Sequence, residues 1–280
     1  MKRYLLCTDL DRTLIPNGAQ PESPDAMARF KRLVAREDVA LAYVSGRHRA
    51  LIEQAIAEFD LPRPDFAIAD VGSTIYRTGD GGWLPWEDWD ALIAPDWAGL
   101  TRDELHGLLS VFGMLRLQEA EKQGRHKLSY YLPPETDTRV LLDEMDRHLK
   151  QAGIRANLIW SVDEARSLGL LDVLPAGANK LHAIRFLMDK QDYRREDTMF
   201  SGDSGNDLDV LLSDIPAVLV ANAHAEVKAL AAQADPASLY VAAGGSLGMN
   251  GNYSAGILEG AAHYWPELAG WLRETLSSRG

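Results

Sequence analysis

Cysteine, positive charge and long apolar runs are all scarce in this sequence of 280 residues. Cys7 is the single cysteine, so no disulfide can form within the chain, and a reducing compartment, the cytoplasm, is expected. The formal net charge of −12 disfavours nucleic acid and anionic membranes as partners. No apolar run approaches the ~18 residues of a membrane-spanning helix. The first apolar stretch meets Asp9 too early for an export signal.

Short apolar runs alternate with amphipathic segments in the first 76 residues and again after residue 178. The runs predict strands at 3–10, 39–47, 64–76, 197–203 and 216–223. Apolar spacing of three and four predicts helices at 23–38, 50–60, 179–191 and 206–214. This order is typical of an α/β fold with a doubly wound parallel sheet.

The middle of the chain has a different pattern. Residues 80–99 hold Trp83, Trp86, Trp89 and Trp97 with little periodicity, and we expect these aromatic rings to pack the joint between two domains rather than to bind a ligand. The following segment predicts helices at 101–113 and 135–153 and strands at 127–133, 155–162 and 168–175. We therefore predict a core domain of residues 1–79 and 176–280, with an α+β cap domain of residues 80–175 inserted into it.

Two aspartates follow the first predicted strand, in DLDRT (9–13). Residues i and i+2 of a strand face the same side, so Asp9 and Asp11 can share a pocket at the carboxyl end of the sheet, where ligands bind. An Asp-x-Asp pair can also simply form a turn. Because two close carboxylates repel unless a cation lies between them, the pair suits either acid chemistry or a Mg²⁺ site. A calcium loop is excluded, since Leu14 and Gln20 stand where it needs Gly and Glu.

Three further segments end or begin predicted elements with matching chemistry. VSGR (44–47) offers a hydroxyl, a glycine and an arginine, GANK (177–180) places Lys180 at a helix start, and SGDSGND (201–207) carries Asp203 and Asp207 one helical turn apart. Taken separately, Ser45 could be a helix cap, Lys180 a surface lysine and Asp203 a turn residue. Together they form one set of groups suited to a phosphate.

With this set the sequence resembles phosphatases of the haloacid dehalogenase superfamily. Their four motifs occur here in order, as DLDRT (9–13), Ser45, Lys180 and GDSGND (202–207). The insertion between the second and third motifs is similar to the larger cap type of that superfamily. VGSTIY, KLSYYL, LLDVLPAGANK and SAGILEG narrow the resemblance to the sucrose-phosphate phosphatase branch, which usually has Thr where Ser45 stands.

The resemblance implies a Mg²⁺-dependent phosphatase of a sugar phosphate, with sucrose 6-phosphate as the leading substrate. It implies that Asp9 forms an aspartyl-phosphate and that Asp11 acts as general acid and base. The implied ligands of Mg²⁺ are Asp9, the backbone carbonyl of Asp11 and Asp203, with Asp207 supporting them.

The resemblance also assigns roles in phosphate and sugar binding. Ser45, the amides around Gly46, and Lys180 would stabilise charge on the phosphoryl oxygens. Asn206 would orient the leaving group. Lys127 in the cap would contact a sugar hydroxyl, unless it is a surface lysine on an edge strand. Arg47 and His48 would meet the phosphate or the sugar, or begin the following helix.

Several alternatives stay open or are disfavoured. The sugar could instead be mannosylfructose phosphate, glucosylglycerol phosphate or trehalose phosphate, and the reaction could be that of a phosphomutase. A receiver-like switch is disfavoured, because Asp11 would hydrolyse its phospho-aspartate. GGSLG (244–248) matches a serine-esterase motif, but no acid stands between its serine and His263, the one histidine that follows. The seven histidines show no zinc-ligand spacing. An enclosed site between core and cap would work in a monomer.

Overall fold

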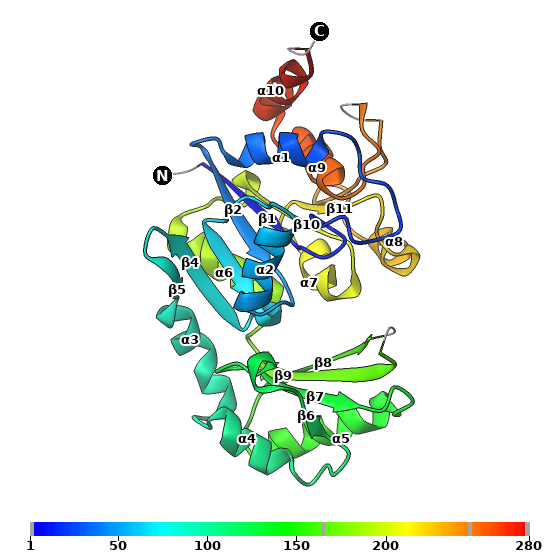
Figure 1. The fold of residues 1–280 in the computed structure, drawn as a ribbon. Coiled ribbons are helices and arrows are strands. Elements are labelled where there is room, and N and C mark those ends of the chain that lie inside the picture. The colour runs from blue at the N-terminus through cyan, green and yellow to red at the C-terminus, as the bar shows by residue number, and fades with distance from the viewer. Residues whose placement is uncertain (1–2, 164–165, 246–247, 278–280) are drawn as a thin grey trace.

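The computed structural model describes residues 3–163, 166–245 and 248–277. Figure 1 shows a large sheet with helices on both faces and, beyond a joint, a smaller sheet with helices on its far side. Within the described ranges no helix is long and apolar enough to cross a membrane.

The large sheet has eight strands in the order β12-β11-β10-β1-β2-β3-β4-β5. Six of them are parallel: β1 (Tyr4–Thr8), β2 (Val39–Val44), β3 (Phe66–Ala69), β10 (Thr198–Gly202), β11 (Ala217–Leu219) and β12 (Leu239–Val241). The antiparallel hairpin of β4 (Thr74–Gly79) and β5 (Gly82–Pro85) closes one edge. Every residue of β1 and β2 is buried, as expected for strands covered on both faces. The predicted doubly wound α/β fold is confirmed.

Two apolar layers cover the sheet. One contains side chains of α1 (Ala26–Val34), α2 (Arg49–Glu58), α9 (Ser254–Tyr264) and α10 (Pro266–Ser277). The other contains side chains of α6 (Lys180–Gln191), α7 (Leu208–Leu211) and α8 (Ala225–Ala231). Asn179 caps α6, because its side chain accepts the amide of His182 at 2.8 Å. This cap fixes Lys180 at the first position of the helix.

Two of the differences between predicted and observed elements lie next to the predicted site. The segment predicted as one strand over 64–76 divides into β3, a tight turn over Asp70–Gly72, and the antiparallel β4. In that turn Val71 has a left-handed backbone (φ 60°), and its amide donates to the carbonyl of Ser45 at 3.1 Å. The predicted helix over 206–214 is the shorter α7 after a 3-10 turn over Gly205–Asp207. Both departures place backbone groups beside the predicted phosphate site.

The cap is a four-stranded antiparallel sheet in the order β6-β7-β9-β8. Its strands are β6 (Arg116–Leu117), β7 (Leu128–Leu132), β8 (Ala156–Asp163) and β9 (Leu168–Pro175). The helices α4 (Arg102–Leu109) and α5 (Thr138–Gln151) pack their apolar sides on the face away from the core (Figure 1). A capping box of Thr101 and Glu104 starts α4. The other face of the sheet is turned toward the core (Figure 1).

Two of the four tryptophans in residues 80–99 lie near the joint between the domains, and the other two are buried within the domains. Trp86 and Trp89, before and within α3 (Glu87–Ile93), pack on Phe186 of α6 with ring centroids 5.2 Å apart in each case. Trp89 Nε1 also donates to the carbonyl of Gly72 at 3.1 Å. Trp83 is buried in the core and Trp97 in the cap. These positions agree with a packing role, and β5 extends the core sheet past the joint predicted near residue 79.

Candidate active site

Asp9 follows β1 at the centre of the sheet, between β10 and β2. One of its carboxylate oxygens accepts the amide of Leu10 at 2.8 Å, and the other lies 3.2 Å from Nζ of Lys180. Burial raises the pKa of Asp9 above its ordinary value, and the positive charge of Lys180 opposes that rise. An ionised Asp9 therefore depends on cations placed beside it.

Lys180 is buried among acidic and amide groups. Its Nζ donates to Asp207 Oδ1 at 2.7 Å and to Asn206 Oδ1 at 3.0 Å, in addition to the contact with Asp9. Although burial alone lowers it, the charges of Asp207 and Asp9 hold the pKa of Lys180 above its usual value. Lys180 is thus a fixed positive charge next to Asp9.

Asp203 and Asp207 complete a buried acidic cluster with Asp9. One carboxylate oxygen from each of the three lies within 4.8 Å of the others. Asp207 Oδ2 accepts the amides of Asp203 and Ser204 at 3.0 and 3.1 Å, so Asp207 shapes the turn after β10. Gly202 is required there, because a Cβ would lie 2.6 Å from the Asp207 carboxyl group. The set of oxygen donors fits a hard divalent cation such as Mg²⁺.

Asp11 faces the same region and is held by an arginine. Arg47 donates two hydrogen bonds of 2.7 Å, from Nε and Nη2, to the two oxygens of Asp11, and Asn17 Nδ2 adds a third at 2.8 Å. Burial raises the pKa of Asp11, but the hydrogen bonds and charge of Arg47 outweigh it and hold this pKa below the usual value. Arg47 thus binds Asp11, the residue predicted to act as both general acid and general base.

The segment after β2 lies against the turn after β3. The Ser45 amide donates to the carbonyl of Ile68 at 2.8 Å, and Ser45 Oγ accepts the amide of Arg47 at 3.2 Å. The turn amides of Asp70 and Val71 donate back to the carbonyls of Arg47 and Ser45, at 3.0 and 3.1 Å. Ser45 is buried, and the contacts with Ile68 and Val71 fix its backbone, while its hydroxyl contacts the Arg47 amide.

A cleft of about 600 Å³ lies between the core and the cap. Core residues on its lining include Gly46, His48 and Asn206. Cap residues on its lining include Lys127 and Asp172. The cleft therefore connects the phosphate motifs of the core with the face of the cap sheet turned toward them.

Lys127 is a buried residue that joins the two domains. It directly precedes β7, a central strand of the cap sheet, so the alternative of an edge-strand surface lysine is wrong. Its Nζ lies 3.3 Å from Asp70 Oδ1 of the core and 3.9 Å from Asp172 Oδ2 of the cap. The hydroxyl contact of Lys127 stays a prediction, and the charged groups beside its ammonium are Asp70 and Asp172.

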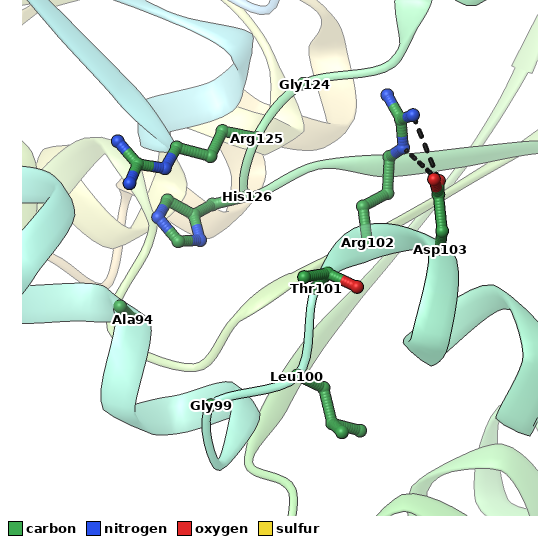
Figure 2. A pocket seen from close by; sticks show the side chains of 9 residues that line it. All are labelled: Ala94, Gly99, Leu100, Thr101, Arg102, Asp103, Gly124, Arg125 and His126. Atoms are coloured by element: carbon green, nitrogen blue, oxygen red, sulfur yellow. Dashed lines mark hydrogen bonds and ion pairs between the residues drawn. The ribbon is translucent and has the colours of Figure 1, made fainter.

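A second hollow, of about 440 Å³, lies on the cap beside the start of α4 (Figure 2). Its arginines are already paired, Arg102 with Asp103 and Arg125 with Asp90, each at 3.0 Å. Its lining within the described residues includes none of the four phosphatase motifs. The cleft between core and cap, whose lining includes Gly46 and Asn206 of these motifs, is therefore the candidate site.

Three contacts at the site were not anticipated from the sequence. Arg12 pairs with Asp203, Asn222 holds the backbone of Arg12, and Asp70 reaches Lys127. Asp70 follows β3, and Asn222 comes soon after β11, so both lie near the carboxyl ends of parallel strands. That position is the signal that could have identified them.

The esterase alternative receives no support from this arrangement. The serine of GGSLG is residue 246, which lies outside the described residues. His263 stacks on Tyr240 with ring centroids 4.4 Å apart, on α9.

Comparison with known proteins agrees with the geometry. The model of the sucrose-6F-phosphate phosphohydrolase family matches residues 2–265. A HAD-like hydrolase of Nitrosococcus oceani is 54% identical over 97% of this chain and 74% of its own length. The Arabidopsis thaliana protein with the name "Probable sucrose-phosphatase 3a" is 32% identical over 80% of the chain. The chain spans about half, 52%, of the length of that plant protein.

The fold is also similar to a solved structure that contains ligands. The sucrose-phosphatase of Synechocystis sp. PCC6803, in complex with sucrose and phosphate, superposes with a TM-score of 0.74 and 27% identity. The match covers 94% of this chain and 98% of that one. The chain belongs to the sucrose-6F-phosphate phosphohydrolase family of the haloacid dehalogenase superfamily, a family of sugar phosphatases.

Proposed function

We propose that the chain is a Mg²⁺-dependent phosphatase that hydrolyses a phosphorylated neutral sugar, with sucrose 6-phosphate as the leading substrate. The observation that carries the proposal is the position of Asp9, beside Lys180 and the acidic pair Asp203 and Asp207, near a cleft of about 600 Å³ closed by the cap. A carboxylate nucleophile among fixed cations is suited to attack at phosphorus.

The donor set supports a particular division of roles at the metal. Both oxygens of Asp207 are occupied, one by Lys180 and one by backbone amides, so Asp207 would support the site rather than bind the ion. Asp9, Asp203 and the carbonyl of Asp11 would hold it. A bound Mg²⁺ would reduce the repulsion between the anionic nucleophile and the anionic phosphate.

The reaction would proceed in two displacements. In the first, a carboxylate oxygen of Asp9 forms a bond to phosphorus while the bond to the sugar oxygen breaks, and Asp11 gives that oxygen a proton. In the second, Asp11 takes a proton from a water molecule, which attacks phosphorus and releases Asp9 and inorganic phosphate. Lys180, the Ser45 hydroxyl and the amide of Gly46 would bind the phosphoryl oxygens throughout.

Arg47 must change its contact with Asp11 during this cycle. Two hydrogen bonds of 2.7 Å from one guanidinium favour the ionised form of Asp11, which lacks the proton that the leaving oxygen needs. Since Gly46 lines the cleft next to Arg47, an arriving phosphate would compete for that guanidinium. Transfer of Arg47 toward the phosphate would free Asp11 to take up a proton.

The charges of the cleft favour a neutral leaving group. Lys122 pairs with Glu119 at 3.3 Å, and Lys127 lies between Asp70 and Asp172. Paired charges of this kind offer both donors and acceptors to hydroxyl groups, but neither of these two lysines is a surplus cation for a second anionic group. Leu51, Ile159 and Leu170 on the lining provide apolar contact for the carbon faces of a sugar.

Phosphate release tests the proposal directly. Purified protein is incubated with phosphorylated disaccharides, glycosylglycerol phosphates and hexose phosphates, with and without Mg²⁺, and free phosphate is measured. Preference for sucrose 6-phosphate is the expected result. Preference for mannosylfructose, glucosylglycerol or trehalose phosphate keeps the mechanism and changes the sugar. Transfer of the phosphoryl group to another sugar without free phosphate would identify a phosphomutase and refute hydrolysis.

A further inference from the structure

Arg12, which follows the two motif aspartates, has an unusual backbone conformation, and hydrogen bonds hold its backbone in place. It adopts the left-handed conformation, with φ 59°. Its amide donates to Asn17 Oδ1 at 2.8 Å, and its carbonyl accepts Nδ2 of Asn222 at 2.6 Å. The backbone of the turn is therefore fixed from both sides without any contribution from the Arg12 side chain.

The side chain of Arg12 is held more loosely than its backbone. Nε lies 3.2 Å from Asp203 Oδ2, and Nη2 lies 3.3 Å from the carbonyl of Asn222. The side chain is still 32% exposed, whereas Asp203 is buried. The guanidinium can thus leave Asp203 and reach solvent while the turn stays in place.

Arg12 and Lys180 contact different members of the buried acidic cluster. Lys180 contacts Asp9 and Asp207, and in the described part of the chain Arg12 is the cation paired with Asp203. Burial and the nearby Asp207 raise the pKa of Asp203, and Arg12 lowers it. Thr13 Oγ1 donates to the other oxygen, Asp203 Oδ1, at 3.2 Å. Asp203 therefore keeps an orienting hydrogen bond if Arg12 departs.

We propose that Arg12 is a tethered cation that neutralises Asp203 when no divalent ion is bound and withdraws when Mg²⁺ binds. The inference rests on the Mg²⁺ site of the proposed function and adds a residue that sets the affinity of that site. Because the ion must displace a partner that is already in place, the apparent affinity equals the intrinsic affinity multiplied by the fraction of molecules in which Arg12 has withdrawn. Arg12 also supplies charge compensation that keeps the metal-free protein folded.

Mg²⁺ titration of wild type, Arg12→Gln and Arg12→Lys by calorimetry tests this role. Arg12→Gln is expected to bind Mg²⁺ about three- to tenfold more tightly than wild type, because nothing has to be displaced. Arg12→Lys, which keeps the charge but loses the planar fork, should lie between them. Arg185→Gln is the matched control: it removes the same charge from an exposed pair with Asp214, and its Mg²⁺ affinity should equal that of wild type.

Melting temperature gives a second readout that does not depend on activity. Without Mg²⁺, Arg12→Gln should melt below wild type, since Asp203 loses its cationic partner, and saturating Mg²⁺ should raise its melting temperature by more than it raises that of wild type. Unchanged or weaker Mg²⁺ binding by Arg12→Gln would overturn the role of Arg12. If Arg12→Gln fails to fold, Arg12→Lys decides between the same two results. Failure of wild type itself to bind Mg²⁺ would refute the metal site of the proposed function.

Discussion

The negative charge of Asp9 can be removed with little change in the shape of the side chain. Asp9→Asn keeps an oxygen for the amide of Leu10 but no longer has the charge that attacks phosphorus. We expect phosphate release to fall at least about a thousandfold. Because burial disfavours the charge of Asp9, thermal stability should be unchanged or higher. Asp214→Asn, an exposed acid of the core, is the control that should keep full activity. Full activity of Asp9→Asn would rule out Asp9 as the nucleophile.

The pair of Arg47 and Asp11 should also leave a signature in the pH dependence of stability. The folded-state pKa of Asp11 is below its ordinary value of 3.8, so the pair stabilises the fold at higher pH and this contribution disappears as pH falls through the folded-state value. Since Asp11 is 42% exposed, solvent screening limits the effect to about 0.5 kcal/mol.

The measurement is urea unfolding of wild type and Arg47→Met at two pH values. At pH 7 the variant should be less stable than wild type by this small amount. The difference should shrink below pH 3.8, where Asp11 becomes protonated first in the unfolded chain and then in the folded one. A difference that stays constant or grows toward acid pH would contradict the assigned cause.

At the scale of single residues, the sequence was most informative at strand ends. Parallel strands place their carboxyl ends along one edge, so polar residues such as Asp9, Ser45 and Asp203 could be grouped from the strand pattern alone. The same pattern could have placed Asn222 there, but it does not predict that the Arg12 side chain contacts Asp203 and the carbonyl of Asn222. These contacts link residues about 200 positions apart through a left-handed turn, and neither feature has a periodic signal in the sequence.

The turn between β3 and β4 shows how a short element positions the site. Gly72 has φ +102°, and a Cβ there would lie 2.4 Å from the backbone carbonyl carbon of Asn179, which caps the N-terminus of helix α6. Gly72→Ala should therefore push apart the turn that holds Ser45 and the helix that carries Lys180. We expect a loss of more than about 2 kcal/mol in the free energy of unfolding.

Gly107→Ala is the matched control for this substitution. Gly107 lies within α4, and a Cβ there meets nothing within 4 Å, so alanine should stabilise the protein by about 0.5 to 1 kcal/mol. Chemical denaturation of both variants gives the two values. A Gly72→Ala variant as stable as wild type would show that the turn and α6 can separate without cost.

The same turn explains why one predicted element was wrong in detail. Residues 64–76 are predicted as a single strand, although Asp70, Gly72 and Ser73 interrupt the apolar residues of the segment. The chain reverses at Asp70–Gly72 because amides there bind the carbonyls of Ser45 and Arg47, which belong to a different strand end. The fully buried strands β1 and β2 and the amphipathic helix α5 needed no such tertiary information, and their bounds lie within about three residues of the predicted ones.

At the scale of the whole molecule, the proposed function assigns phosphate chemistry and sugar recognition to different domains. Asp9, Ser45 and Lys180 all belong to elements of the core sheet and its helices, whereas Lys122 and Lys127 belong to the cap. Substitutions in the cap could therefore change the specificity for the sugar without altering the groups proposed to act on phosphorus. Such a division would also limit what the sequence alone can predict, because the proposed sugar site is formed by side chains that the relative position of two domains brings together.

Lys127 tests this division, since it is the cap residue that reaches the core through Asp70. Lys127→Met keeps most of the buried stem and removes the charge, so we expect KM for the preferred sugar phosphate to rise about ten- to a hundredfold. Hydrolysis of p-nitrophenyl phosphate, whose leaving group offers no hydroxyls to the cap, should change by less than about twofold.

Asp70→Asn and the double variant complete the argument. If Asp70 orients Lys127 for the sugar, its loss should raise KM for the sugar phosphate, and the double variant should be little worse than Lys127→Met alone, because both changes remove one interaction. Melting temperatures of the three variants separate this effect from loss of domain packing. Equal loss with both substrates would mean instead that Lys127 acts on the phosphate site through the turn at Asp70, so that core and cap would share the chemistry as well as the sugar.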